Sequence, residues 1–189
     1  MASGAIRLEE APVDVLVLRC QEGDLHAFGA LYDLYHRDVF RIVTRIVGDD
    51  TDIADIVQQA FVEIERSIHR FDGRSALRTW IFGLVANLAC KHIRKAVRRR
   101  RALRRLESFP QARVHRPDEM LEQAEAVAIL ARALDQLDPK RRVVFILSTM
   151  EGMSADETAT ALEVPVGTVY RRLSEARAHL RTALEEASR

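Results

Sequence analysis

The sequence of 189 residues has no apolar run that approaches the roughly 20 residues a membrane-spanning helix needs. Its first ten residues also lack the basic start, the apolar stretch and the small-residue cleavage site of a secretory signal. We therefore expect no membrane insertion and a cytoplasmic protein.

Cysteine is scarce, since only Cys20 and Cys90 occur, far apart and with no CxxC or His/Cys cluster near them. This excludes a disulfide framework and gives no support to a zinc site, so both thiols are expected to be buried as small hydrophobic groups. The histidines are scattered, no Ser/His/Asp set clusters, and no glycine-rich loop could cradle a phosphate. The sequence thus predicts that the protein is not an enzyme and has no catalytic residue, cofactor, metal or small-molecule substrate.

Glycine and proline are also few, with 8 and 5 residues, while 48% of the residues are apolar and 30% are charged. This composition is typical of a soluble, helix-rich protein that buries a core. No strand-like alternation of useful length occurs, so we predict an all-α protein with two helical domains joined by a flexible linker.

The formal net charge is only +1, but the charges are segregated along the chain. Aspartates gather between residues 49 and 55, and nearly every second residue from Lys91 to Arg105 is basic. Because like charges at this density repel one another, the basic run favours a polyanion partner, although a solvated helix face would give the same pattern.

The first domain is expected over residues 13–104, after a mobile start at 1–12. Val13 to Glu22 is predicted to be a short helix that ends at Gly23, and Asp24 suits the N-cap of a long second helix that ends at Gly48. That second helix has an amphipathic stripe at three- and four-residue spacings, made of Leu25, Phe28, Leu31, Leu34, Tyr35, Val39, Ile42, Val43 and Ile46.

A third helix follows, with Thr51 or Asp52 as its cap and an apolar face that continues to the break at residues 71–73. Ser75 is predicted to begin a fourth helix, which runs through Trp80 into the basic run. The indole of Trp80 could offer a stacking platform for DNA, but its apolar neighbours favour packing in the core.

Periodicity stops between residues 105 and 118, where two X-Pro pairs lie in a polar stretch, and we interpret this segment as the linker. The second domain, 119–187, is predicted to begin with a helix from Met120 to Leu137. A second helix starts at Asp138-Pro139, a cap followed by a proline at the first helical position, and ends before Gly152.

Residues 154–177 have the layout of a helix-turn-helix. Ser154 and Glu157 have the spacing of a capping box, the first helix ends at Leu162, and a turn containing Glu163 leads into a last helix from Val166 to about residue 186. Glu163 stands where the backbone of such a turn favours positive φ and glycine is usual. An ordinary helical hairpin with a charged face is the alternative.

The two faces of the last helix differ in chemistry. Apolar residues at spacings of four, three and four form an inward face, made of Val169, Leu173, Ala176 and Leu180. The residues expected to face a major groove are Thr168, Arg171, Arg172, Ser174 and Glu175. Arginine can donate two hydrogen bonds to guanine, and a carboxylate can accept one from cytosine.

The motifs in both halves resemble those of one family. LDPKRRVVF at 137–145, EGMSADETA at 151–159 and VGTV at 166–169 are similar to region 4 of the extracytoplasmic-function sigma factors, within the sigma-70 family. DIVQQAF at 55–61, TWI at 79–81 and ANLA at 86–89 resemble region 2 of the same family. The resemblance implies an alternative sigma factor that binds core RNA polymerase, recognises −35 and −10 promoter elements and promotes DNA opening.

The resemblance also implies roles for particular residues. In region 2, Asp55, Gln58 and Gln59 match positions that meet the polymerase clamp helices, with Gln59 in place of the usual Glu. The positions implied for the −10 element are Phe71, Arg74, Ser75 and Ala76 in a loop that takes up a flipped base, and Asn87, Lys91, Arg94 and Lys95 on the following helix. Lys91 stands where the family often has Asp or Asn, so the preferred −10 sequence does not transfer.

Region 4 of the family binds the −35 element and the polymerase flap, and family members are usually held inactive by an anti-sigma factor. The implied partners are therefore core RNA polymerase, promoter DNA and an anti-sigma factor. Two other functions stay open at this point: a stand-alone helix-turn-helix regulator that binds DNA as a dimer, and an interaction protein that sequesters another factor.

Overall fold

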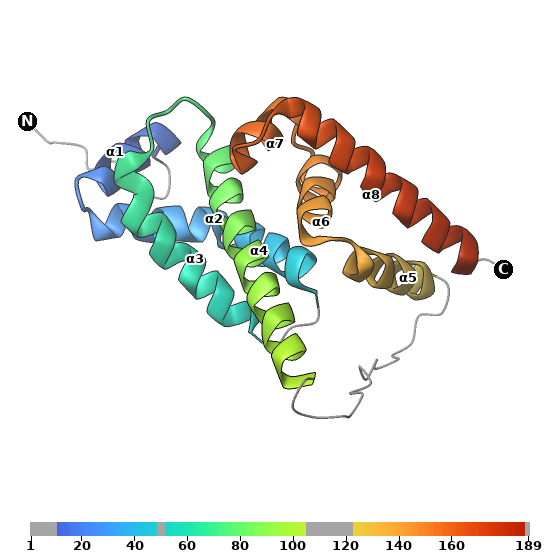
Figure 1. Ribbon diagram of the computed structural model, residues 1–189. Coiled ribbons are helices and arrows are strands. Elements are labelled where there is room, and N and C mark those ends of the chain that lie inside the picture. The colour runs from blue at the N-terminus through green and yellow to red at the C-terminus, as the bar shows by residue number, and fades with distance from the viewer. Residues whose placement is uncertain (1–10, 49–51, 105–122, 188–189) are drawn as a thin grey trace, which may run out of the picture.

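The structure is a computed structural model that describes residues 11–48, 52–104 and 123–187. All regular secondary structure in these ranges is helical, which confirms the all-α prediction (Figure 1). The first half contains α1 (Val13–Gln21), α2 (Leu25–Val47), α3 (Ile53–Ser67), the 3₁₀ turn η2 (Ile68–Arg70) and α4 (Leu77–Arg104). The second half contains α5 (Gln123–Gln136), α6 (Pro139–Phe145), the π-helical turn η3 (Ile146–Met150), α7 (Ala155–Leu162) and α8 (Val166–Ala187).

Local capping chemistry explains most of the helix boundaries. The Asp24 carboxylate accepts hydrogen bonds from the backbone N–H groups of His26 and Ala27 at 2.8 and 3.2 Å, and α2 ends at Gly48, whose φ is +79°. The Asp138 carboxylate accepts from the Lys140 N–H at 3.0 Å, with Pro139 at the first helical position. These three predicted boundaries are confirmed.

One predicted boundary differs from the structure, and one predicted cap lacks its side-chain hydrogen bond. The fourth helix begins at Leu77 and not at Ser75, because residues 73–75 form a bend that includes Gly73 at φ +73°. Asp52 occupies the N-cap position of α3, but its side chain makes no capping hydrogen bond. The predicted linker at 105–118 and the predicted helix start at Met120 lie outside the described residues.

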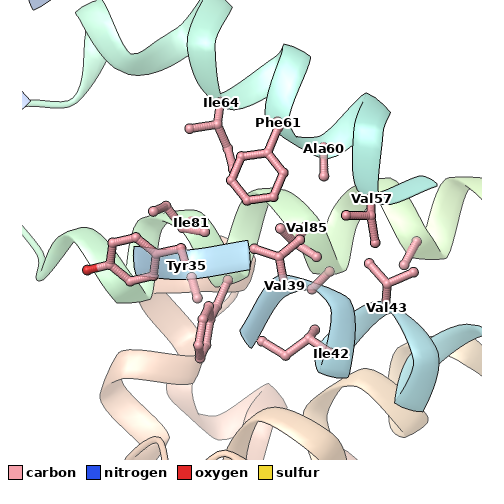
Figure 2. Close-up of a cluster of buried hydrophobic side chains, with 14 of the residues drawn as sticks. Tyr35, Val39, Ile42, Val43, Val57, Ala60, Phe61, Ile64, Ile81 and Val85 are labelled. Atoms are coloured by element: carbon pink, nitrogen blue, oxygen red, sulfur yellow. The ribbon is translucent and has the colours of Figure 1, made fainter. Parts of the chain in front are cut away.

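The core of the first half lies where α2, α3 and α4 meet (Figure 2). Side chains of α2 and α3 converge on α4 there, among them Tyr35, Val39, Ile42 and Val43 from α2, Val57, Ala60, Phe61 and Ile64 from α3, and Ile81 and Val85 from α4. The predicted stripe of α2 is thus largely buried. Leu25 and Leu34 are exceptions, with 75% and 52% of their surface exposed.

The same core continues into the second half, where Val143, Ile146, Leu147, Met153 and Ala161 belong to it. Figure 1 shows α4 with α3 on one side and α6 and α7 on the other, while α2 crosses behind α4 and also contacts α6. A smaller cluster joins α5 to α8 through Ala133, Leu134, Leu137, Ala176 and Leu180. Among the described residues, no helix is long and apolar enough to cross a membrane.

Candidate nucleic-acid interface

α7 and α8 form a helix-turn-helix whose turn is fixed by backbone geometry. The Ser154 hydroxyl accepts from the Glu157 N–H at 3.1 Å and the Glu157 carboxylate accepts from the Ser154 N–H at 2.8 Å, so the predicted capping box is present. These hydrogen bonds lower the pKa of the Glu157 carboxyl. Glu163 ends α7 in the left-handed conformation at φ +53°, which confirms the positive φ expected at that turn position.

The two faces of α8 have the predicted orientation. Val169, Ala176 and Leu180 are buried, and Leu173 is half-buried, so this face holds α8 against α5, α6 and α7. Of the predicted −35 residues, Arg171 and Ser174 are exposed, whereas Thr168, Arg172 and Glu175 are half-buried. The sequence-predicted residues therefore form one continuous face on the first turns of α8.

The Glu175 carboxylate joins two arginines on this face. One oxygen accepts from Arg171 Nη1 at 3.1 Å, one helical turn away, and the other accepts from Arg141 Nε at 2.8 Å. Arg141 lies on α6 and was not predicted as a site residue. The residues around Arg141 do not predict its contact with Glu175, because the two lie 34 positions apart and meet only through the packing of α6 against α8.

A second row of polar and basic side chains runs along α4. Asn87, Lys91, Arg94 and Lys95 are all exposed, at spacings that keep them on one side of the helix. Arg98 extends the row by a further turn, and α4 itself continues to Arg104. Such a row presents positive charge to a nucleic-acid backbone, with one amide capable of donating to and accepting from a base.

The loop before α4 is anchored at its start and open at its tip. Gln21 of α1 donates through Nε2 to the carbonyl oxygens of Ile68 and Phe71 at 3.1 and 2.8 Å, a contact between distant segments that no local motif predicts. The Phe71 ring packs against Trp80 with centroids 5.5 Å apart. Trp80 is partly buried against the core, as predicted.

The tip of this loop carries Arg74 and Ala76, which are exposed, and Ser75, which is half-buried. Arg74 forms an ion pair with Asp72 at 2.9 Å. The loop thus brings together the predicted residues Phe71, Arg74, Ser75 and Ala76.

α3 and α2 border an apolar groove of about 550 Å³ on the outside of the first half. Gln58 lines it, whereas Asp55 and Gln59 are exposed on α3 outside its lining. Aromatic side chains that were not predicted as site residues supply the groove's surface, since the ring centroids of Tyr32 and Phe61 lie 4.4 Å apart and Phe40 is 46% exposed. One sequence pattern could have indicated them: Phe28, Tyr32 and Phe40 are separated by multiples of four residues and so lie on one side of α2.

A second groove, of about 640 Å³, lies on the second half between α5, α6 and α8. It is lined by the apolar side chains of Leu130, Phe145, Leu180 and Leu184 and by charged groups that include Arg177 and Arg181. Cys20 and Cys90 are buried and unpaired, as predicted, and burial raises the pKa of both thiols. In the ranges that the structure covers, no group of three His, Cys, Asp or Glu side chains could hold a metal ion.

Comparison with known proteins identifies both halves. Residues 31–99 match the family model described as sigma-70 region 2, and residues 128–180 match the one described as sigma-70, region 4. The chain is 30% identical to the ECF RNA polymerase sigma-E factor of Escherichia coli over 177 residues, which cover 89% of this chain and 92% of that protein.

Two solved structures are similar over most of the chain. CnrH, solved in complex with the cytosolic domain of CnrY, is 26% identical with a TM-score of 0.64, over 91% of this chain and 96% of that one. The sigma factor RpoE of Bartonella quintana, solved in complex with the anti-sigma factor NepR, has the same fold with a TM-score of 0.66 and 21% identity, over 84% of this chain and 96% of that one.

Proposed function

The chain belongs to the extracytoplasmic-function sigma factors of the sigma-70 family, non-catalytic subunits of RNA polymerase that bind promoter elements through regions 2 and 4, and we propose which of its surfaces perform each task. We assign residues 13–104 to the region 2 domain, 119–187 to the region 4 domain and 105–118 to the linker, after an N-terminal segment at 1–12.

The first turns of α8 read the −35 element. Support comes from the continuous face of Thr168, Arg171, Arg172, Ser174 and Glu175 and from the start of α8, whose backbone N–H groups suit a phosphate. Arg171 and Arg172 donate to base edges or phosphates. Glu175 holds Arg171 and Arg141 in place, so we extend the −35 surface to Arg141 on α6.

α4 and the loop before it bind the −10 element. Asn87 faces the displaced strand, and Lys91, Arg94 and Lys95 hold its phosphates, a contact that positions DNA without specifying its sequence. The exposed loop of Arg74, Ser75 and Ala76 takes up a flipped base, and the Phe71 ring packed on Trp80 forms its floor. Extruding a base costs a few kcal/mol of stacking, which such a pocket offsets.

Core polymerase binds the apolar groove between α2 and α3. Gln58 lines the groove and Asp55 and Gln59 lie exposed beside it on α3, while Tyr32, Phe40 and Phe61 supply the apolar surface that strong interfaces need, the partner being the clamp helices. The groove bordered by Phe145 and Leu180 on the second half takes the polymerase flap. We also propose an anti-sigma factor as a partner, because RpoE of Bartonella quintana, which shares the fold, is solved with one.

The observation that carries this assignment is the presence of two exposed surfaces with basic side chains, on α4 and on α8, in a chain that also bears an apolar groove lined by aromatic residues. A stand-alone regulator would use α7 and α8 and would leave the α4 row and the α2–α3 groove without a role.

Run-off transcription with purified bacterial core polymerase on a library of promoter fragments tests the assignment. Initiation that depends on this protein is expected, and sequencing the active fragments reveals both elements. Arg171→Ala and Arg172→Ala should lower promoter-specific initiation about 5- to 150-fold each, from the ~1–3 kcal/mol of a good base contact, and leave core binding unchanged. Arg37→Ala, an exposed arginine on α2, is the matched control. Tight, salt-sensitive binding to free duplex without any initiation would favour the stand-alone regulator.

A further inference from the structure

The recognition helix α8 carries an exposed aromatic side chain to which the −35 assignment gives no role. Tyr170 lies on the second turn of α8, and 61% of its surface is exposed. Within the described ranges, its ring packs against no other ring and its hydroxyl makes no hydrogen bond. An aromatic ring that stays in water contributes little to the stability of the fold, because its stabilising effect comes from burial. The Tyr170 ring is therefore available to a partner.

The position of Tyr170 around α8 follows from the helical repeat. Successive residues of an α-helix are turned by about 100° from one another. Val169 is fully buried and holds the helix to its domain, and Tyr170, Arg171 and Arg172 then follow around the helix. Arg171 therefore faces away from the core, with Tyr170 on one side of it and Arg172 on the other.

The side of α8 that contains Arg172 is polar. Thr168, Arg172 and Glu175 lie there, at spacings of four and three residues. The Glu175 carboxylate accepts from Arg171 Nη1 at 3.1 Å. This ion pair directs the Arg171 guanidinium toward the polar side of the helix and leaves the Tyr170 ring uncovered.

The side of α8 that contains Tyr170 is apolar over the first two turns. Val166 precedes Tyr170 by four residues, so the two side chains are neighbours on the helix surface. Val166 is the first residue of α8 and is 38% exposed. A third exposed apolar residue of α8, Leu184, lies more than three turns further along and borders the groove of the second half. The end of α8 that we assign to the −35 element thus has a polar side and an apolar side.

The base edges in a major groove offer one apolar group. Every base pair presents hydrogen-bond donors or acceptors there, and thymine alone adds a C5-methyl group. Arginine and glutamate read the donors and acceptors, whereas a valine side chain and the face of a tyrosine ring bury apolar surface. A thymine methyl group is therefore the feature of DNA that fits the apolar side of α8.

We propose that Tyr170, together with Val166, selects a thymine in the −35 element by burying its C5-methyl group. The proposal rests on the proposed assignment of the −35 element to α8, and it adds an apolar contact to the polar contacts of that assignment. Arg171 and Arg172 bind on the other side of the helix. Tyr170 is thus the residue that distinguishes a T·A pair from the other base pairs at one position of the element.

Deoxyuridine isolates this contact, because it differs from thymidine only by the loss of the C5-methyl group. The template is a promoter recovered from the transcription screen, in which the thymines of the −35 element, on either strand, are replaced one at a time. Run-off transcription with core polymerase and this protein measures initiation on each template. We expect one position at which the replacement lowers initiation about 4-fold, the effect of returning one methyl group to water, and little effect at the others.

Variants of the two apolar residues identify the partner of the methyl group. Tyr170→Ala should lower initiation on the thymine template and remove the difference between the thymine and uracil templates. Tyr170→Phe keeps the ring and should retain that difference, whereas Val166→Ala should reduce it to about 2-fold. The matched control is Leu18→Ala, which removes an apolar side chain that is 60% exposed on α1 and should leave initiation on both templates unchanged.

The outcomes separate this proposal from the one it rests on. Equal initiation by wild type on every thymine and uracil template would overturn the thymine contact, while the −35 assignment would stand if Arg171→Ala and Arg172→Ala still lower initiation. A Tyr170→Ala protein that still distinguishes thymine from uracil would assign the methyl contact to another residue and would also overturn the proposal. If no base change in the −35 element alters initiation, the assignment of α8 to that element is itself refuted.

Discussion

The Glu175 carboxylate lies 2.8 Å from the guanidinium of Arg141, although the two residues are 34 positions apart. This ion pair connects the first turn of α6 to the face of α8 that we assign to the −35 element. Because the other Glu175 oxygen accepts from Arg171, the carboxylate in the free protein is shared by two arginines. We therefore propose that Glu175 acts on DNA through the orientation of Arg141 and Arg171.

Replacing Glu175 with Gln tests this role. We expect promoter-specific initiation to fall about 2- to 5-fold, since exposed ion pairs of this kind contribute up to ~1 kcal/mol, and to fall equally on promoters that differ by single bases in the −35 element. Run-off transcription across such a promoter series measures it. A loss confined to promoters with a cytosine at one position would instead mean that Glu175 accepts a hydrogen bond from that base.

The row of basic residues on α4 leads to a prediction about salt. Lys91→Ala and Arg94→Ala should each reduce the slope of log affinity against log salt by about 0.7, because each removes one phosphate contact to a single strand and its released counterion. The measurement is binding of the polymerase complex to single-stranded −10 DNA over a series of salt concentrations. Arg66→Ala, an exposed arginine on α3, should leave the slope unchanged. An unchanged slope for both α4 variants would exclude these residues from the DNA backbone.

Boundaries that depend on neighbouring residues could be predicted from the sequence. The caps at Asp24, Asp138 and Ser154 and the left-handed turn at Glu163 each depend on a few consecutive residues, and all four agree with the structure. The DNA-facing side of α8 also followed from sequence, because its buried and exposed residues alternate with the period of a helix.

Contacts between distant segments could not be predicted in this way. Glu151 belongs to a motif that sequence reasoning assigned to region 4, yet its partners Arg41 and Arg45 lie more than 100 positions earlier. Nothing in the spacing of residues around Gly83 indicates that Ala161 will lie against it. Such pairs depend on how whole helices pack, which a single sequence does not encode in a local pattern.

The capping box gives a prediction about stability and pH. Ser154→Ala should lower the free energy of unfolding by about 1 kcal/mol at neutral pH, which is a typical cost of losing an N-cap. The pKa of Glu157 is lowered in the folded protein, so its contribution is fully present above its ordinary pKa near 4.5 and is lost as the pH falls through the lowered value.

Thermal unfolding of wild type and Ser154→Ala at a series of pH values measures this effect. The difference between the two proteins should be largest at neutral pH and should narrow as the solution becomes more acidic than pH 4.5. A conservative control, Ser154→Thr, keeps a hydroxyl at the N-cap and should retain most of the stability of wild type. If the stability difference between wild type and Ser154→Ala stays constant down to the lowest pH measured, Glu157 does not contribute to the cap.

The groove between α2 and α3 gives the last prediction. Tyr32 lines this groove, 38% exposed and packed against Phe61, and aromatic residues that become buried on binding supply much of the energy of protein interfaces. Tyr32→Ala should weaken binding to core polymerase by about 30-fold, or ~2 kcal/mol, and leave affinity for DNA unchanged.

Leu34→Ala is the matched control, because Leu34 is 52% exposed on the same helix and does not line the groove. Competition for core polymerase against wild-type protein measures both variants. Equal weakening by the two substitutions would show that α2 had been destabilised as a whole, and no weakening by either would move the polymerase contact away from this groove.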